Sequence, residues 1–463
     1  MEHLRRVDAY ASTCTMTVRM IFHTSRMAML AGVLASCSHA APAPAAWSEA
    51  WLAQQQALYL DSAVSRRGSL EASLSNHANS YSQHRLGAYG LVDSGWDVLP
   101  VWNPRSITLN TLAAVAAPTL PTTPLWDGVR PTRLADWIEL GRKAFFNYPL
   151  RSEFAIEHVL APLAERRDET LASANALGLE SMPNGDMPGV VAYADVDGGT
   201  RLGITCALCH TVVRDGALII GAARRRLDFG ALRLTFFRET NSYVEPELAR
   251  RMASWGPGRA DVTEDDDQDP VAIPDLWALR DQQFLTQAGT IRHIGPAALA
   301  IRQETQLLHA NLQRIRPPRE IAWALAMYLY SLTPPQGREA GDTVVVAQGR
   351  QLFDQHCQSC HSSPSWSGDA YPVARIGTDP ALATGHGRGT GRYRTPALLR
   401  VVDAAPYLHD GSVRTLDELL GPERFATDYK TGLLGPGPIA GHRFGTELPV
   451  DDRRALRVFL ESL

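Results

Sequence analysis

The chain has 463 residues, with 45 lysine and arginine side chains against 49 aspartate and glutamate side chains. This length allows two or three domains, each with a substantial core. A formal net charge of −4 gives no reason to expect nucleic acid or an anionic membrane surface as a partner.

The first recognisable pattern is a short apolar run, preceded by arginines, that ends in Leu34-Ala35-Ser36-Cys37. Such a pattern is typical of export signals. It resembles a bacterial lipoprotein signal over residues 1–36, in which Cys37 is lipidated and becomes the mature N-terminus. The alternative is a secretory signal cleaved near Ala40-Ala41. Both interpretations predict a periplasmic or other extracytoplasmic protein, and the first adds a lipid anchor in a membrane.

The segment 37–130 starts with an Ala-Pro-Ala-Pro tether and a short helical pattern. It continues with many Ser, Asn, Gly, Tyr and Trp residues and little periodicity. We therefore expect an irregular segment that wraps the rest of the protein, and its residues point to no chemistry. His77 and His84 are expected to be surface or turn residues rather than iron ligands.

Clear helical periodicity begins near Arg133, where apolar residues fall on one face of a predicted helix. The phrase Gly141-Arg142-x-x-Phe145 in this helix returns as Gly349-Arg350-x-x-Phe353. A glycine at this position lets another backbone approach closely. The same phrase at two places indicates an internal repeat.

A second phrase supports the repeat. Ala324-Leu325-x-x-Tyr328-Leu329 returns as Ala455-Leu456-x-x-Phe459-Leu460 near the end of the chain. Each copy lies in a predicted amphipathic helix. The duplication predicts two units, residues 131–335 and residues 336–463, each of which opens and closes with a helix.

Each unit contains one Cys-x-x-Cys-His motif, the attachment signature of a c-type haem. Cysteines at positions i and i+3 share one face of a helical turn, so they can reach two vinyl groups on one porphyrin edge. The next residue then projects an imidazole toward the iron. We predict that the cysteines attach two haem c groups and that the histidines are the proximal iron ligands: Cys206, Cys209, His210, Cys357, Cys360 and His361.

Two alternatives use the same cysteines. One is a pair of redox-active Cys-x-x-Cys sites. The other is a four-cysteine zinc site, which gives neither histidine a role. The haem interpretation uses every motif residue, so it predicts a mainly α fold with two cytochrome c-like haem domains in tandem after the irregular N-terminal segment.

The second unit also contains Arg394-Thr395-Pro396 and, further on, Pro406-Tyr407-x-His409-Asp410-Gly411. With the haem motif upstream, these phrases resemble the bacterial di-haem cytochrome c peroxidase superfamily, over roughly residues 131–463. That group includes peroxidases, the methylamine-utilisation di-haem enzyme and the haem rubber oxygenases. The resemblance implies that one iron keeps an open or displaceable site for peroxide or dioxygen, and that the other iron stores or relays an electron.

The chain departs from the peroxidase pattern at the second haem. Its last methionine is Met327, which precedes the second motif, so the usual methionine ligand is missing. His442, in a loop rich in Gly and Pro, is the predicted distal ligand, similar to the late histidine of the rubber oxygenases; the alternative is an ordinary loop residue. His386 and Tyr429 are weaker candidates, as is His409, which we expect to be a packed residue with a hydrogen-bonded ring.

The ligand opposite His210 cannot be identified from the sequence. His293 is a candidate distal acid–base group or displaceable ligand, and the alternative is a buried structural histidine. Trp277 is a candidate electron relay between the haems, and the alternative is a packed core residue. The remaining candidates, of which the methionines are better explained by core packing, are Met182, Met187, Met252 and His309.

The acidic run Glu264–Asp269 is a candidate calcium site, because the resemblance implies calcium at the haem interface of some relatives. Its spacing lacks the glycine and the closing glutamate of an EF-hand. A solvated acidic loop is therefore the alternative.

The predicted function is that of an exported, peroxidase-like di-haem oxidoreductase. Peroxide or dioxygen would be activated at the N-terminal haem, and the C-terminal haem would relay electrons from a small donor, a cytochrome c or a cupredoxin. The alternatives are a di-haem cytochrome that only transfers electrons and a haem oxygenase that acts on an organic substrate. The unequal sizes of the two units favour the enzyme.

Overall fold

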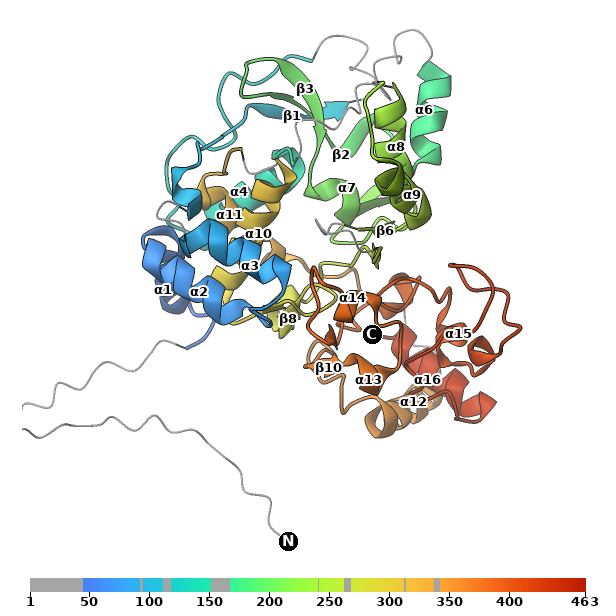
Figure 1. Ribbon diagram of the computed structural model, residues 1–463. Helices are drawn as coiled ribbons and strands as arrows, with labels where there is room; N and C mark the ends of the chain where they lie inside the picture. Colours follow the sequence, from blue (N-terminus) through green and yellow to red (C-terminus); the bar gives the residue numbers. More distant parts are fainter. Residues whose placement is uncertain are drawn as a thin grey trace, which may run out of the picture. The chain divides into compact units, whose positions relative to one another are not determined.

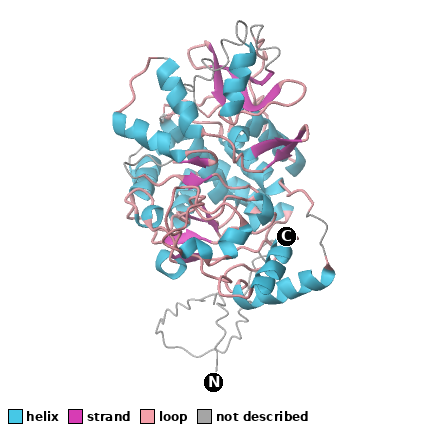
Figure 2. Cartoon of the chain, turned by 90° about the vertical axis from the view of Figure 1, so that its right-hand side faces the viewer, coloured by secondary structure: helices cyan, strands magenta, loops and turns pink. Residues whose placement is uncertain are grey.

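Helices make up most of the secondary structure, and the strands form five small sheets among the described residues (Figure 1, Figure 2). The predicted mainly α class is therefore confirmed. The structure is a computed structural model that describes residues 45–91, 95–110, 118–150, 167–239, 241–261, 268–311, 314–336 and 342–463. The predicted signal over residues 1–36 and the predicted lipidation of Cys37 lie outside the described residues.

The elements keep the labels of Figure 1. The helices are α1 (Glu49–Leu60), α2 (Ala63–Ser73), α3 (Ser80–Leu86), α4 (Leu134–Asn147), α6 (Arg167–Ala176), α7 (Cys206–His210), α8 (Phe229–Glu239), α9 (Pro246–Trp255), α10 (Pro296–Ala310), α11 (Arg319–Ser331), α12 (Thr343–His356), α13 (Val373–Ile376), α14 (Ala381–Thr384), α15 (Leu416–Leu420) and α16 (Val450–Glu461). The strands are β1 (Ser106–Asn110), β2 (Asp186–Ala194), β3 (Thr200–Ile204), β4 (Thr211–Arg214), β5 (Ala217–Ile220), β6 (Arg259–Ala260), β7 (Val271–Ala272), β8 (Phe284–Leu285), β9 (Ile291–Arg292), β10 (Ala370–Pro372) and β11 (Arg392–Arg394).

The N-terminal segment is more regular than the sequence predicted. Helices α2 and α3 and strand β1 lie in the stretch that we expected to be irregular. Two side chains cap these helices, since Ser62 accepts a hydrogen bond from the backbone of Ser65 and Asn79 accepts one from Ser82. The prediction failed because the buried face of α2 includes Arg66, which donates to the Tyr89 hydroxyl at 2.7 Å, so the helix shows little apolar periodicity.

The repeated phrases form two equivalent helix pairs. Helix α4 packs against α11, and α12 packs against α16. At the first crossing a Cβ atom on Gly141 would lie 2.0 Å from the carbonyl oxygen of Ala324. At the second crossing a Cβ atom on Gly349 would lie 2.0 Å from the carbonyl oxygen of Ala455. Both glycines are thus required by direct contact between two helix backbones.

The aromatic residues of the two phrases also pack in the same way. The rings of Phe145 and Tyr328 are 5.3 Å apart at an interplanar angle of 60°. The rings of Phe353 and Phe459 are 5.3 Å apart at 58°. The sequence repeat therefore corresponds to a repeated three-dimensional contact.

Replacement of Gly349 by alanine should test this contact. We expect the free energy of unfolding to fall by roughly 1–3 kcal/mol, because a methyl group would overlap the Ala455 carbonyl and push the helices apart. Denaturant unfolding measures the change. The control is Gly68→Ala in α2, where no atom lies within 4 Å of the added carbon, and which should be neutral or slightly stabilising. Equal destabilisation by both substitutions would contradict the assignment.

A three-stranded antiparallel sheet, in the order β1-β2-β3, lies before the first motif. Val191 in the central strand pairs with Thr108 on one side and with Gly203 on the other. Strand β3 ends at Ile204, two residues before Cys206. The sheet therefore fixes the point at which the first motif begins.

The largest apolar cluster combines residues of the N-terminal helices with residues of α4, α10 and α11. A second cluster surrounds β2, α8 and α9. A third is made of residues between Val346 and Leu463. The N-terminal segment thus shares its core with the first helix pair, while the domain boundaries at residues 131 and 336 stay predictions.

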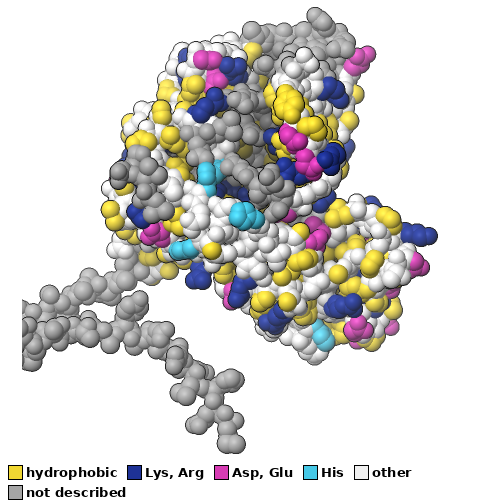
Figure 3. Space-filling model, viewed as in Figure 1, with side chains coloured by type: hydrophobic (Ala, Val, Ile, Leu, Met, Phe, Trp, Pro, Cys, Tyr) yellow, Lys and Arg dark blue, Asp and Glu magenta, His cyan; other side chains and the backbone are white. Residues whose placement is uncertain are grey.

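No helix among the described residues has both the length and the apolar character of a membrane span. On the face shown in Figure 3, basic and acidic side chains are interspersed among apolar ones. This distribution agrees with the balanced composition of the chain.

Candidate functional site

The first motif is the short helix α7. The Thr205 side chain caps it by accepting a hydrogen bond from the backbone of Ala207 at 3.3 Å. A Cβ atom on Gly189 of strand β2 would lie 2.1 Å from the backbone nitrogen of Leu208. The helical turn therefore rests directly on the sheet, and this contact fixes the position of Cys206 and Cys209.

The second motif continues from the end of α12. The backbone nitrogen of Cys357 donates to the carbonyl of Phe353, which anchors the turn to the helix. The backbone nitrogens of Cys360 and His361 both donate to the carbonyl of Cys357 at 3.0 Å. Both motifs are therefore tight turns in which the two cysteines and the histidine are close neighbours, as predicted.

Both histidines of the motifs are held in the same way. His210 Nδ1 lies 3.0 Å from the carbonyl oxygen of Pro274, and His361 Nδ1 lies 2.9 Å from that of Trp366. A carbonyl accepts only, so Nδ1 carries the proton and Nε2 keeps a free lone pair. Burial lowers the pKa of His210 to about 4 and also lowers the pKa of His361. Each imidazole is thus neutral at pH 7, which is the form that binds a metal.

Three of the four motif thiols lack the lowered pKa of redox-active cysteines. Burial raises the pKa of Cys206 to about 12, that of Cys209 to about 11 and that of Cys357 to about 12. Redox-active Cys-x-x-Cys pairs instead have lowered pKa values, because the thiolate is the reactive form. The described residues, which include the four motif cysteines, contain no group of three His, Cys, Asp or Glu side chains arranged to hold a metal ion. This argues against the four-cysteine zinc alternative.

Four of the motif side chains are surrounded by protein on all sides, but a part of their surface is not covered by neighbouring atoms. They are Cys206, Cys209, His210 and His361. Side chains with both properties face an internal space rather than bulk solvent. A cavity is described beside the second motif.

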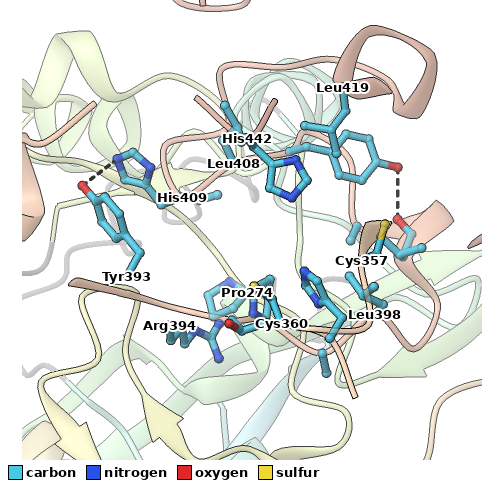
Figure 4. Close-up of a pocket in the computed structure, with 18 of the residues that line it drawn as sticks. Pro274, Cys357, Cys360, Tyr393, Arg394, Leu398, Leu408, His409, Leu419 and His442 are labelled. Carbon is cyan, nitrogen blue, oxygen red and sulfur yellow. Dashed lines mark hydrogen bonds between the residues drawn. The ribbon is translucent and has the colours of Figure 1, made fainter. Parts of the chain in front are cut away.

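At the second motif this space is a cavity of about 260 Å³ (Figure 4). The volume is far larger than a single water molecule needs. Cys357 and Cys360 lie on one side, and His442 points into the cavity from the other side. Leu408 and Leu419 contribute to an apolar wall, so the cavity suits a large and mostly apolar group.

His442 has an imidazole that no protein group binds. Its Nδ1 atom is buried and has no hydrogen-bond partner among the described residues. Burial is the largest effect that lowers the pKa of His442 to about 4, and the nearby His361 and Arg424 contribute to the same shift. His361 and His442 both line this cavity. A neutral, unsatisfied imidazole beside a cavity fits the predicted distal metal ligand.

The loop that carries His442 is held by Arg424. The fully buried guanidinium donates four hydrogen bonds to backbone carbonyls, those of Leu419, Ile439, Gly441 and His442. The backbone nitrogen of His442 also donates to the carbonyl of Ile376 at 2.8 Å. His442 has a positive φ of 47°, a strained conformation for a residue with a side chain. These bonds stabilise the strained loop.

Replacement of Arg424 by methionine should release this loop. We expect the free energy of unfolding to fall by roughly 2–4 kcal/mol, since four buried or partly buried backbone carbonyls would lose a charged donor. The control is Arg443→Met in the same loop, where the side chain is exposed, with an expected change within about 0.5 kcal/mol. Chemical denaturation of both variants measures the difference. Similar values for the two would show that Arg424 does not hold the loop.

The other predicted ligands of the second haem have different positions. His409 lines the cavity, and its Nε2 lies 3.1 Å from the Tyr393 hydroxyl. Its ring also stacks on Tyr393, with centroids 4.1 Å apart. These contacts confirm the expectation of a packed and hydrogen-bonded ring. His386 and Tyr429 are not among the residues that line the cavity.

His293 is fixed at both ring nitrogens. Nδ1 lies 2.7 Å from the carbonyl oxygen of Gln282, and Nε2 lies 2.5 Å from the Tyr330 hydroxyl. The ring is also stacked on Tyr330, with centroids 5.6 Å apart. This geometry fits the alternative of a structural histidine. It does not favour the prediction that His293 is a distal group at the first haem.

Trp277 lies between the two motifs. It is buried, and its Nε1 donates to the carbonyl of Ile220, at the end of the hairpin that follows the first motif. The same side chain lines the cavity at the second motif. Its predicted role as an electron relay is not tested by these contacts, but the position meets the geometric requirement.

Two methionine candidates for the ligand opposite His210 are explained by core packing. Met187 and Met252 are fully buried in the second apolar cluster, as expected for core packing.

The possible calcium site falls largely outside the described residues, which resume at Gln268, so calcium binding stays a prediction. No spacing pattern identifies Arg424 or the carbonyls of Pro274 and Trp366 in the sequence, because hydrogen bonds of this kind do not depend on periodicity.

No protein-family model and no curated protein matches the chain. Among solved structures, it is similar to a MauG-like protein associated with microbial copper homeostasis, with 19% identity over 45% of this chain and 78% of that chain and a TM-score of 0.32. It is also similar to a hydrazine synthase chain from Kuenenia stuttgartiensis, with 12% identity over 75% of this chain and 99% of that chain and a TM-score of 0.33. Both TM-scores are too low to identify a fold.

Proposed function

We propose that this protein is an exported di-haem c-type oxidoreductase that activates peroxide or dioxygen at the first motif, with the second motif as an electron relay. The observation that carries the proposal is the cavity at the second motif. Two thiols at the correct spacing lie at one wall, and two neutral imidazoles, His361 and His442, both line it. This donor set fits a haem attached through Cys357 and Cys360 with two axial histidines.

The first motif offers the same attachment residues in different surroundings. The charged groups that act on His210 are the guanidinium groups of Arg225 and Arg302. The group that acts most strongly on His442, after burial, is the His361 imidazole. The two sites therefore have unlike environments, which favours an enzyme with two different irons over a carrier with two equal ones.

A bound haem would supply redox chemistry at each motif and a coordination site for peroxide or dioxygen at the first. The chain itself sets the properties of the ligands. Donation from Nδ1 of His210 to the Pro274 carbonyl fixes the orientation of the ring and raises the basicity of Nε2. The bond between His361 and the Trp366 carbonyl does the same at the second motif.

The same segment links the two sites. Pro274 accepts the hydrogen bond from His210 and also lines the cavity at the second motif. Three residues later, Trp277 lines that cavity and donates to Ile220 near the first motif. Residues 274–277 thus offer a short route for electrons between the proposed irons.

Export of the protein is proposed from the sequence signal and from the attachment chemistry, with a lipid on Cys37 as the anchor. The electron donor would be a small cytochrome c or cupredoxin. Mass spectrometry of the mature N-terminus is the direct test of lipidation.

Two measurements on the purified protein test the proposed function. Mass spectrometry should detect two covalently bound porphyrins, and a Cys206→Ala, Cys209→Ala variant should carry one. The EPR spectrum of the oxidised protein should contain one low-spin and one high-spin ferric signal. Two low-spin signals that peroxide leaves unchanged would favour the carrier alternative, and a protein without Soret absorbance would refute the haem assignment.

The distal role of His442 has a separate test. Its replacement by alanine should convert the second haem from low-spin to high-spin, because the iron loses its sixth ligand, and added imidazole should restore the low-spin spectrum. The control is His409→Phe, which changes a histidine of the same cavity that is already bound to Tyr393, and it should leave the spin state unaltered. Optical and EPR spectra report the result, and a low-spin signal in the alanine variant would exclude His442.

A further inference from the structure

Three arginine side chains line the cavity at the second motif, Arg225, Arg375 and Arg394. Two of them have other surroundings that accommodate their charge. The guanidinium of Arg225 forms an ion pair with Asp275 at 3.3 Å. Arg375 is exposed, and its guanidinium carbon lies 4.5 Å from the centre of the Tyr371 ring. Arg394 is the third, and it has neither a carboxylate partner nor an exposed position.

Arg394 lies in strand β11, and its side chain is part of the cavity wall (Figure 4). Its Nη1 donates to the side-chain oxygen of Gln282, and its Nε donates to that of Gln287 at 3.4 Å. In the part of the chain that the structure describes, Nη2 makes no hydrogen bond and the guanidinium makes no ion pair. A buried guanidinium with only neutral partners is unfavourable unless an anion binds it.

Asp275 is the charged group that acts on Arg394, but its carboxylate has other partners. Its Oδ1 accepts a hydrogen bond from the backbone nitrogen of Ala223 at 2.7 Å, and its Oδ2 is the atom paired with Arg225. Burial lowers the pKa of Arg394 to about 10, and Asp275 opposes this shift. Arg394 therefore still carries its positive charge at pH 7, in a cavity whose wall is largely apolar.

The segment 282–293 holds Arg394 in place. The backbone nitrogen of Arg394 donates to the backbone carbonyl of Gln287 at 3.0 Å. The Gln287 side chain in turn lies 3.3 Å from the carbonyl of Ala272, to which its Nε2 donates. Gln282 is buried, and its backbone carbonyl lies 2.7 Å from Nδ1 of His293. Both amides that accept from Arg394 are thus fixed, so the guanidinium has little freedom to leave the cavity wall.

From this geometry we propose that Arg394 binds a carboxylate in the cavity at the second motif, that this carboxylate is a propionate of the second porphyrin, and that Gln282 positions the guanidinium. The propionate assignment rests on the proposed function. Guanidinium groups bind carboxylates through charge-assisted hydrogen bonds. Cys357 and Cys360 line the same cavity, so a porphyrin attached to them would bring its own carboxylates into the space that Arg394 faces.

The test uses the whole chain with both porphyrins attached. A positive charge beside the propionate favours the reduced iron, so Arg394→Leu should lower the reduction potential of the second haem. We expect the equilibrium constant for its reduction to fall about tenfold, which is about 59 mV for one electron. Arg394→Lys keeps the charge and should recover part of this loss. Spectroelectrochemical titration measures both haems, and the potential of the first haem should shift less.

Two further variants separate positioning from a general structural effect. Gln282→Glu places a carboxylate of the same shape against the guanidinium, so it competes with the propionate and should also lower the potential of the second haem. The control is Arg392→Leu in the same strand, an exposed arginine outside this cavity that donates to the Ala370 carbonyl at 2.8 Å, and it should shift neither potential. Resonance Raman spectra should show a changed propionate bending band of the second haem in Arg394→Leu and Gln282→Glu, and an unchanged band in Arg392→Leu.

The possible failures are distinguishable. If both porphyrins are attached and the potential and the propionate band are unchanged in Arg394→Leu, the propionate assignment is overturned and the proposed function stands. If Arg394→Leu does not fold, an unchanged propionate band in Gln282→Glu overturns it instead. If added acetate or succinate shifts the second haem of the natural protein to saturation, Arg394 binds a diffusible carboxylate and the propionate assignment is wrong. If the natural protein carries no porphyrin, the proposed function itself fails, and the propionate assignment fails with it.

Discussion

A single backbone contact, made once in each half of the protein, determines where the two motifs lie. A glycine in the opening helix touches a carbonyl of the closing helix, at Gly141 with Ala324 and at Gly349 with Ala455. Because the backbones meet directly, little freedom remains in how the helices cross. Helix α12 then runs into Cys357, and α4 contacts α7, which carries Cys206. These two helix crossings thus determine the positions of the attachment residues.

Desolvation is the second constraint, and at both motifs it favours the uncharged form of the side chains. Burial keeps the imidazoles of His210, His361 and His442 neutral, and it keeps the thiols of Cys206, Cys209 and Cys357 protonated. Neutral histidines suit metal ligation, and protonated thiols are less reactive in disulfide exchange. The same low-dielectric surroundings strengthen the backbone hydrogen bonds that hold each ring. The chemistry of the proposed haem sites is therefore a consequence of packing.

The N-terminal segment and the loop of His442 are the two places where polar side chains organise the fold. Arg66 and Tyr81 lie in the former, and Arg424 lies in the latter. Each is buried, and Arg66 and Arg424 satisfy backbone or side-chain acceptors that apolar residues would leave unpaired. Such contacts fix a position without an apolar pattern, and they place the N-terminal segment beside the first motif and His442 beside the second.

The sequence by itself determined the features that depend on local spacing. The two Cys-x-x-Cys-His motifs, the repeated glycine and aromatic phrases and the mainly α class all follow from residues a few positions apart. Tertiary structure alone decided which groups meet across long separations: Pro274 with His210, and Arg424 with the His442 loop. It also engaged both ring nitrogens of His293. A hydrogen bond or a buried charge between distant segments leaves no periodic trace in the sequence, so only the folded chain reveals it.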